Sequence, residues 1–143
     1  MTTTSTAEAR TAAGTPLKIG LWTAQITVFA LFTLFGSMKL LMPVDRLAAM
    51  WIWPGQVPTW FLHLTGILDV AGGIGVLLPA VTRIEPRLTV LAALGCTLLQ
   101  MAAIIFHLSR GETAAVPLNF VLLALSVFIF WGREKRAPIA PRG

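Results

Sequence analysis

The sequence predicts an all-α integral membrane protein, in which four apolar helices form a bundle. Hydrophobic residues make up 56% of the 143 residues and charged residues only 12%, whereas soluble domains carry roughly 25% charged residues. Four apolar stretches are each long enough to cross a hydrocarbon core about 30 Å thick, which takes about 20 helical residues. Helices are expected because lipid satisfies no backbone hydrogen bonds, and strands of this length would not close a barrel.

The boundaries of these elements follow from charge and proline. Residues 1–16 are rich in Thr and Ala and predict a disordered cytoplasmic tail. Residues 17–133 form the predicted transmembrane domain, and residues 134–143 a basic cytoplasmic tail. The expected spans are about 19–42, 60–81, 88–108 and 116–132. Because the first span exceeds the about 7–15 apolar residues of a signal peptide, we expect it to stay uncleaved. Prolines fall at or between span ends, at Pro43, Pro54, Pro58, Pro79, Pro86 and Pro117.

The distribution of Lys and Arg predicts that both termini are cytoplasmic. In that orientation the outer side holds only Lys39, Arg46 and Arg110, and the other eight lie inside, as the positive-inside rule requires. The sequence therefore predicts a multi-pass N-in/C-in protein of the cell inner (cytoplasmic) membrane. In the long first outer loop, residues 44–53 predict a short interfacial helix with Asp45 in its first turn. All five tryptophans fall where interfacial belts are expected, with half-buried rings and hydrated N–H groups.

Composition also excludes several kinds of site. Cys96 is the single cysteine, so the chain has no internal disulfide and no Cys-x-x-Cys metal or redox motif. The net charge of +5 comes from residues at span ends rather than from one basic patch, which argues against a nucleic-acid partner. We expect no metal, and no flavin, haem or iron–sulfur motif is evident.

Polar residues inside the spans are concentrated toward the outer side. From a helical rise of 1.5 Å per residue, a shallow layer about 2–6 Å below the outer boundary contains Lys39, His63, His107 and Asn119. Asp69 and Gln100 lie roughly 12–13 Å deep by the same arithmetic. The inner half contains only Gln25 and Ser126. A polar site is therefore expected in the outer half of the bundle.

Helical phase gathers polar and small residues onto one face of each span. The first span carries Gln25, Phe29, Phe32, Gly36 and Lys39 on one face. The second carries Gly66, Asp69, Gly72 and Gly73. The third carries Thr89, Ala93, Cys96, Gln100, Ala103 and His107. Because small residues mark close helix approach in membranes, we expect these faces to point into the bundle.

Lys39 and Asp69 are predicted to form an ion pair, directly or through His107 or water. Side chains lean toward the N-terminus of their helix, so Lys39 leans inward and Asp69 outward, which closes a depth gap of about 7 Å. An unpaired Asp at the bilayer centre costs on the order of 3 kcal/mol on insertion scales. Two alternatives remain open, that the pair is structural and that Lys39 instead extends to the headgroups.

For other residues a structural role is the simpler interpretation. Gln100 and Asn119 are expected to hydrogen-bond between helices, and Cys96 to act as a small packing residue. His63 lies off the face of Asp69. Because His63 and His107 lie at similar depth, the two could ligate a haem, but no pocket motif supports this. The two charges in the third loop, Arg110 and Glu112, are most simply a solvated pair.

At these positions the sequence resembles the DoxX-like family of small four-helix membrane proteins. The resemblance spans residues of about 17–133 and rests on GSMKL (36–40) with Pro43, GILDVAGG (66–73) with LLP (77–79), HLSRGE (107–112) and PLN (117–119). It implies a cytoplasmic-membrane protein, some of whose relatives are linked to sulfur oxidation at the quinone pool or to redox-stress complexes. This chain departs from the family at Asp69, where relatives often carry Glu.

These residues support several functional hypotheses. The first is a protein that binds a lipophilic small molecule such as a quinone, as a subunit of a redox-linked complex or as a homo-oligomer. Its ligand-binding residues would be Lys39, Asp69, Gln100, His107, Asn119, Phe29, Phe32 and His63. The second is an enzyme that uses Asp69 and His107 as acid and base on a lipophilic substrate. A small proton-coupled transporter and an assembly scaffold are further alternatives.

Overall fold

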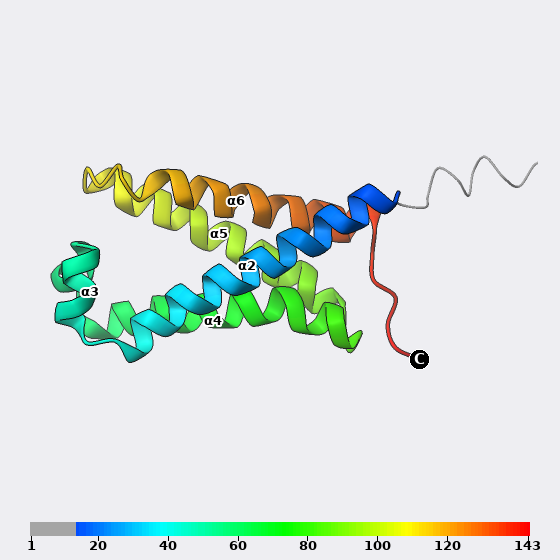
Figure 1. Cartoon of the computed structure of the whole chain (residues 1–143), viewed down its shortest axis with the longest axis horizontal. Helices are drawn as coiled ribbons and strands as arrows, with labels where there is room; N and C mark the ends of the chain where they lie inside the picture. Colours follow the sequence, from blue (N-terminus) through cyan, green and yellow to red (C-terminus); the bar gives the residue numbers. More distant parts are fainter. Residues whose placement is uncertain (1–13) are drawn as a thin grey trace, which may run out of the picture.

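The computed structural model describes residues 14–143, and over this range all regular structure is helical. Four long helices lie along one another in the bundle shown in Figure 1, namely α2 (Thr15–Leu41), α4 (Thr59–Thr82), α5 (Arg87–Ser109) and α6 (Val116–Trp131). All four are long and apolar enough to cross a membrane, the last together with the π-helical turn η2 (Gly132–Arg136). The predicted all-α, four-span fold is confirmed.

The start of α2 falls inside the segment that was expected to be a tail. Residues 1–13 of that segment lie outside the described residues, whereas α2 already begins at Thr15. Pro16 occupies its first turn, where a proline sacrifices no helical hydrogen bond and its fixed φ favours the helix. The helix then runs for 27 residues without interruption.

The bundle pairs α2 with α4 and α5 with α6, and α4 also packs along α5. Its central core consists of Ala24, Val28, Phe32, Val76, Ala93, Cys96, Leu122 and Ile129. Each helix also has an apolar outer face, on which Ile26, Ile67, Ile105 and Val121 are 54–67% exposed. So much exposed apolar surface is incompatible with a monomer in water and is matched to contact with a lipid bilayer.

One end of the bundle, here termed the capped end, carries the connection from α2 to α4 and the connection from α5 to α6 (Figure 1). The first connection contains a short helix, α3 (Val44–Met50), followed by the 3-10 turn η1 (Trp53–Gln56). Leu47 and Trp53 are buried against Leu62 of α4, so this connection is packed onto the bundle. The predicted short helix is confirmed, with Asp45 in its first turn.

The opposite end, here termed the terminal end, carries the start of α2, the α4–α5 connection and the C-terminal segment (Figure 1). Residues 137–142 run back to the α4–α5 connection, where the Arg142 amide donates to the Arg83 carbonyl at 2.8 Å. The Arg83 side chain in turn donates through Nε to the Ala140 carbonyl at 3.0 Å. The segment predicted as a basic tail, residues 134–143, therefore starts within η2 and is tied to the bundle.

Candidate functional site: a buried ion pair beside an apolar groove

The crossing of α2 and α4 is built on two glycines that face each other. A Cβ added to Gly36 would lie 2.7 Å from the Gly66 carbonyl oxygen and 2.9 Å from the Asp69 Cβ. A Cβ added to Gly66 would lie 3.0 Å from the Lys39 Cβ. The absence of these two side chains lets the backbones approach closely and leaves room for the stems of Lys39 and Asp69.

Lys39 and Asp69 form a direct ion pair at this crossing. The Lys39 Nζ donates to the Asp69 Oδ2 at 2.6 Å, and the two side chains are only 15% and 8% exposed. The predicted pairing is confirmed, and it needs no bridge from His107. Burying two charged side chains is costly unless they are paired. The contact therefore holds α2 and α4 at this relative position and keeps both charges inside the bundle.

Trp53 covers the ion pair from the capped end. Its ring centroid lies 5.5 Å from the Lys39 Nζ, within the range of a cation–π contact. The same ring packs edge-on against Phe106 and His107, at centroid distances of 5.8 and 6.4 Å. Trp53 is only 9% exposed, so its ring is buried rather than half-buried as predicted. The connection folds inward because Trp53 buries its ring against Leu62 and the ion pair.

His107 belongs to a second polar group at the capped end. Its Nδ1 lies 2.8 Å from the Glu112 Oε2, and because a carboxylate only accepts, Nδ1 carries the proton. Arg110 donates to the other Glu112 oxygen at 2.9 Å and also to Gln56 of η1. The prediction of a simple solvated pair in this loop is therefore incomplete, because Glu112 also contacts His107 of α5, and Arg110 reaches Gln56 of η1. No hydrogen bond joins His107 to Asp69 among residues 14–143, so the geometry does not favour them as an acid–base pair.

The Glu112 contacts predict a pH dependence of stability. Burial raises the pKa of Glu112, but hydrogen bonds from His107 and Arg110 outweigh it and hold that pKa below its ordinary value of 4.5. A carboxyl group with a lowered pKa stabilises the folded state fully above its ordinary pKa, and this contribution is lost as the pH falls further. The melting temperature of the wild type should therefore fall more steeply from about pH 5 to about pH 3 than that of Glu112→Gln. Asp45→Asn, which removes an exposed acid at the same end, should keep the wild-type slope; equal slopes for all three proteins would refute the role of Glu112.

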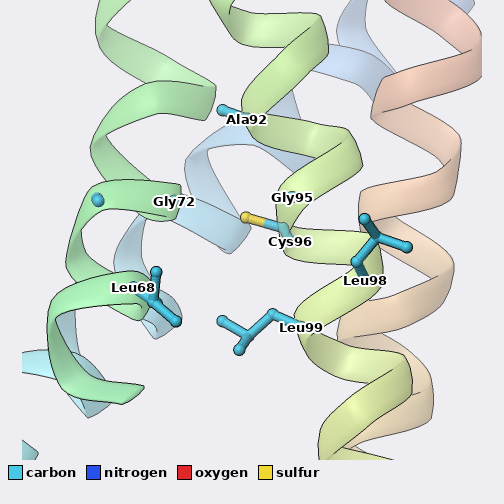
Figure 2. Close-up of a pocket in the computed structure, with 8 residues that line it drawn as sticks. Leu68, Gly72, Ala92, Gly95, Cys96, Leu98 and Leu99 are labelled. Carbon is cyan, nitrogen blue, oxygen red and sulfur yellow. The ribbon is translucent and has the colours of Figure 1, made fainter. Parts of the chain in front are cut away.

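An apolar groove of about 510 Å³ opens between α4 and α5, and neither Lys39 nor Asp69 lines it. Its lining is made of small and aliphatic residues, Leu68, Ala71, Gly72, Ala92, Gly95, Cys96, Leu98 and Leu99. Figure 2 shows Leu68 and Leu99 facing each other across the groove, with the Cys96 sulfur directed toward Gly72. Leu68 directly precedes Asp69, and Gly72 follows it by about one helical turn, so the groove lies along the same stretch of α4 as Asp69.

The other predicted site residues differ in burial and in hydrogen bonding. Gln100 is 6% exposed, and its Oε1 has no hydrogen-bond partner among the described residues; the same holds for the Asn119 Nδ2. The predicted inter-helix hydrogen bonds of these two amides are therefore absent at these atoms. Phe32 is buried in the core and Phe29 is half-buried. His63 is exposed on α4, because its position lies off the face of Asp69, so the structure does not bring it to the site.

Sequence reasoning missed a polar contact at the terminal end. Arg133, which the charge count treats as a cytoplasmic flanking residue, is only 5% exposed and donates through Nε to the Gln25 Oε1 at 2.7 Å. Gln25 in turn donates to the Val76 carbonyl of α4 at 2.8 Å. The signal in the sequence was Gln25 itself, a buried polar residue in the inner half without a predicted partner.

The fold and the buried ion pair define a small four-span integral membrane protein with a polar site inside its bundle. The DoxX-like family model matches residues 23–129. Since this covers most of the chain, the protein belongs to the DoxX-like family. No curated protein and no solved structure matches the chain.

Proposed function

We propose that this protein binds a lipophilic small molecule with a polar head, of the quinone type, between α4 and α5. The observation that carries the proposal is the apolar groove between α4 and α5, whose lining residues Leu68 and Leu99 directly precede the buried Asp69 and Gln100. Its volume of about 510 Å³ falls within the roughly 300–1,000 Å³ of typical ligand pockets. An apolar cavity with a few convergent polar groups at one end is the usual form of a site for such molecules.

The chemistry of the polar end suits a ring that carries carbonyl or hydroxyl groups. The Lys39 ammonium has donors beyond the one given to Asp69, and a quinone carbonyl accepts such a bond. The unpartnered Oε1 of Gln100 offers an acceptor that a quinol hydroxyl would satisfy. Gln100 directly follows Leu99 of the groove lining, and Asp69 directly follows Leu68. The head would therefore lie at the level of Asp69 and Gln100.

The groove suits the apolar tail of the same molecule. Leu68 and Leu98 in its lining are 46% and 58% exposed on the lipid-facing side of the bundle, so a membrane-dissolved molecule could approach laterally. Burial of an apolar tail contributes roughly 25 cal/mol per Å² of surface removed from water, but little when the alternative is lipid. Selectivity among lipophilic molecules would therefore come from contacts to the polar head, and the groove would accommodate the apolar tail.

The distribution of charge supports a cytoplasmic orientation of the terminal end. That end carries Lys18, Arg83, Arg87, Arg133, Lys135, Arg136 and Arg142, whereas the capped end carries Lys39, Arg46 and Arg110. By the positive-inside rule the terminal end would face the cytoplasm, in the inner membrane of the cell. The ligand head would then lie in the outer half of the bilayer, where a redox partner subunit could exchange electrons with a bound quinone.

A groove-filling substitution tests the proposal. Gly95 lines the groove, and a Cβ there meets no atom within 4 Å, so Gly95→Leu should place its side chain in the groove. Purified wild-type protein should bind a short-tailed ubiquinone in detergent, and Gly95→Leu should weaken this binding at least about tenfold, or 1.4 kcal/mol. Binding is measured by equilibrium dialysis against the radiolabelled quinone.

The matched control for this experiment is Ala102→Leu. Ala102 is exposed on the same helix but does not line the groove, so this variant should bind the quinone as the wild type does. Asp69→Asn, which alters the polar head of the site, should also weaken binding. A wild type without measurable affinity for the quinone, or equal affinity in Gly95→Leu and Ala102→Leu, would overturn the proposed function.

A further inference from the structure

The terminal end contains a buried guanidinium with an unused donor. Arg133 is 5% exposed, donates through Nε to Gln25 and donates through Nη1 to the Ala137 carbonyl at 3.1 Å. Its Nη2 is buried and has no hydrogen-bond partner among residues 14–143. Buried donors on charged groups are costly when they remain unpaired. The guanidinium therefore has capacity for one further acceptor.

The charge of Arg133 is also not balanced by any acid in the described part of the chain. The ion pairs found there involve Lys39, His107 and Arg110, but not Arg133. The Trp22 ring lies 4.9 Å from the guanidinium carbon and provides a cation–π contact, which accommodates the cation without neutralising it. Buried charges in proteins are normally paired, so an anion from outside the described residues would suit this position.

A small cleft of about 140 Å³ is formed around Arg133. Its lining comes from the first turn of α5, from η2 and from the C-terminal segment, namely Pro86, Arg87, Val90, Arg133, Glu134, Pro138 and Ile139. The volume is many times the about 10–15 Å³ that a cavity needs to hold one water, which leaves room for a phosphate group but not for a whole lipid.

The electrostatics of this cleft favour an anion. Arg87 and Arg133 contribute two positive charges, and the N-terminus of α5 directs its partial positive charge toward the same place. Glu134 is the one acid in the lining, and it is exposed. Arginine forms paired hydrogen bonds to phosphate oxygens, so the unused Nη2 and the Arg87 side chain match this group.

We propose that the cleft formed by Arg87, Arg133 and the C-terminal segment is a second binding site, specific for a phosphate group. The group could belong to the head of an anionic phospholipid or to a phosphate in solution, because both present the same oxygens. This site lies at the opposite end of the bundle from the Lys39–Asp69 ion pair, and it does not depend on the proposed quinone site. A basic pocket between transmembrane helices on the cytoplasmic side is the usual setting for anionic lipid heads.

The test measures binding to the full chain in a neutral detergent. Native mass spectrometry and melting temperature are recorded with added phosphatidylglycerol, phosphatidylcholine or inorganic phosphate. We expect phosphatidylglycerol, inorganic phosphate or both to bind and to raise the melting temperature. Phosphatidylcholine should not, because its choline cation cancels the charge of its phosphate and would lie among the arginines of the cleft. A response to phosphatidylglycerol alone identifies a lipid head as the source, and an equal response to inorganic phosphate identifies a soluble anion.

Variants decide whether the anion occupies this cleft. Arg87→Gln and Arg133→Gln should each weaken anion binding at least about tenfold, while Lys18→Gln, which removes a positive charge at an exposed position of the same end outside the cleft, should not. Arg87 is also exposed, so Arg87→Gln keeps the test decisive if Arg133→Gln fails to fold. Equal binding of phosphatidylglycerol and phosphatidylcholine, or an equal loss in Arg87→Gln and Lys18→Gln, would overturn the proposal.

Discussion

Replacing Lys39 with methionine should destabilise the protein by about 3–5 kcal/mol, the range expected when one partner of a buried ion pair is removed. The variant leaves the Asp69 carboxylate, whose side chain is 8% exposed, without its partner. Asp69→Leu should cost less, because the unpaired Lys39 has a long stem that can move its charge toward the headgroups. The double variant Lys39→Met/Asp69→Leu should recover most of the loss, because no buried charge remains.

These effects are measurable as a double-mutant cycle. Each protein is unfolded in mixed micelles by increasing SDS, and helix content is followed by circular dichroism. Arg46→Met removes a charge from an exposed position at the same end and should stay within about 0.5 kcal/mol of the wild type. If the losses of the two single variants simply added in the double variant, Lys39 and Asp69 would not act as a pair.

Gly36→Ala should also destabilise the protein, by about 1–3 kcal/mol or more, as overpacking of a tight contact does. The new Cβ would lie 2.7 Å from both the Gly66 carbonyl oxygen and the Val70 Cγ2. Because the carbonyl belongs to the backbone of α4, relief requires the two helices to separate, which also lengthens the contact between Lys39 and Asp69. The loss is measured by the same SDS titration.

Gly95→Ala is the matched control for this substitution. It also replaces a helical glycine, but its Cβ meets nothing within 4 Å. Alanine has the higher helix propensity by up to about 1 kcal/mol, so Gly95→Ala should be neutral or stabilising. Similar losses in the two variants would mean that the α2–α4 crossing has no special requirement for glycine.

The Lys39–Asp69 contact could be predicted from the sequence because it follows from local geometry. The direction of the Cβ atoms, the helical rise and the cost of an unpaired charge in lipid are the same in any bundle. The interior face of α5 was predictable for a similar reason, since its small and polar residues recur at helical spacing. Thr89, Ala93, Cys96, Gln100 and His107 of that face are all buried.

The features that could not be predicted depend on how separate segments fold onto one another. Trp53 is buried because η1 turns inward over the ion pair, which its composition does not specify. Arg133 is buried because the C-terminal segment folds back, where Ala137 accepts its Nη1 hydrogen bond. Small residues predict close approach of α4 and α5, and the helices do approach closely where a Cβ on Gly72 would lie 2.7 Å from the Cys96 Sγ. The groove beside this contact depends on how the neighbouring leucines pack, which helical spacing does not specify.

Photoaffinity mapping tests the proposed quinone site most directly. The full chain in lipid nanodiscs is irradiated with a ubiquinone analogue that carries a diazirine on its tail, and the labelled residues are identified by mass spectrometry. We expect labels on residues 68–72 of α4 and 92–99 of α5, which an excess of unlabelled quinone prevents. Labels spread evenly over lipid-facing positions such as Ile26 and Val121, and unaffected by competitor, would contradict a quinone site between α4 and α5.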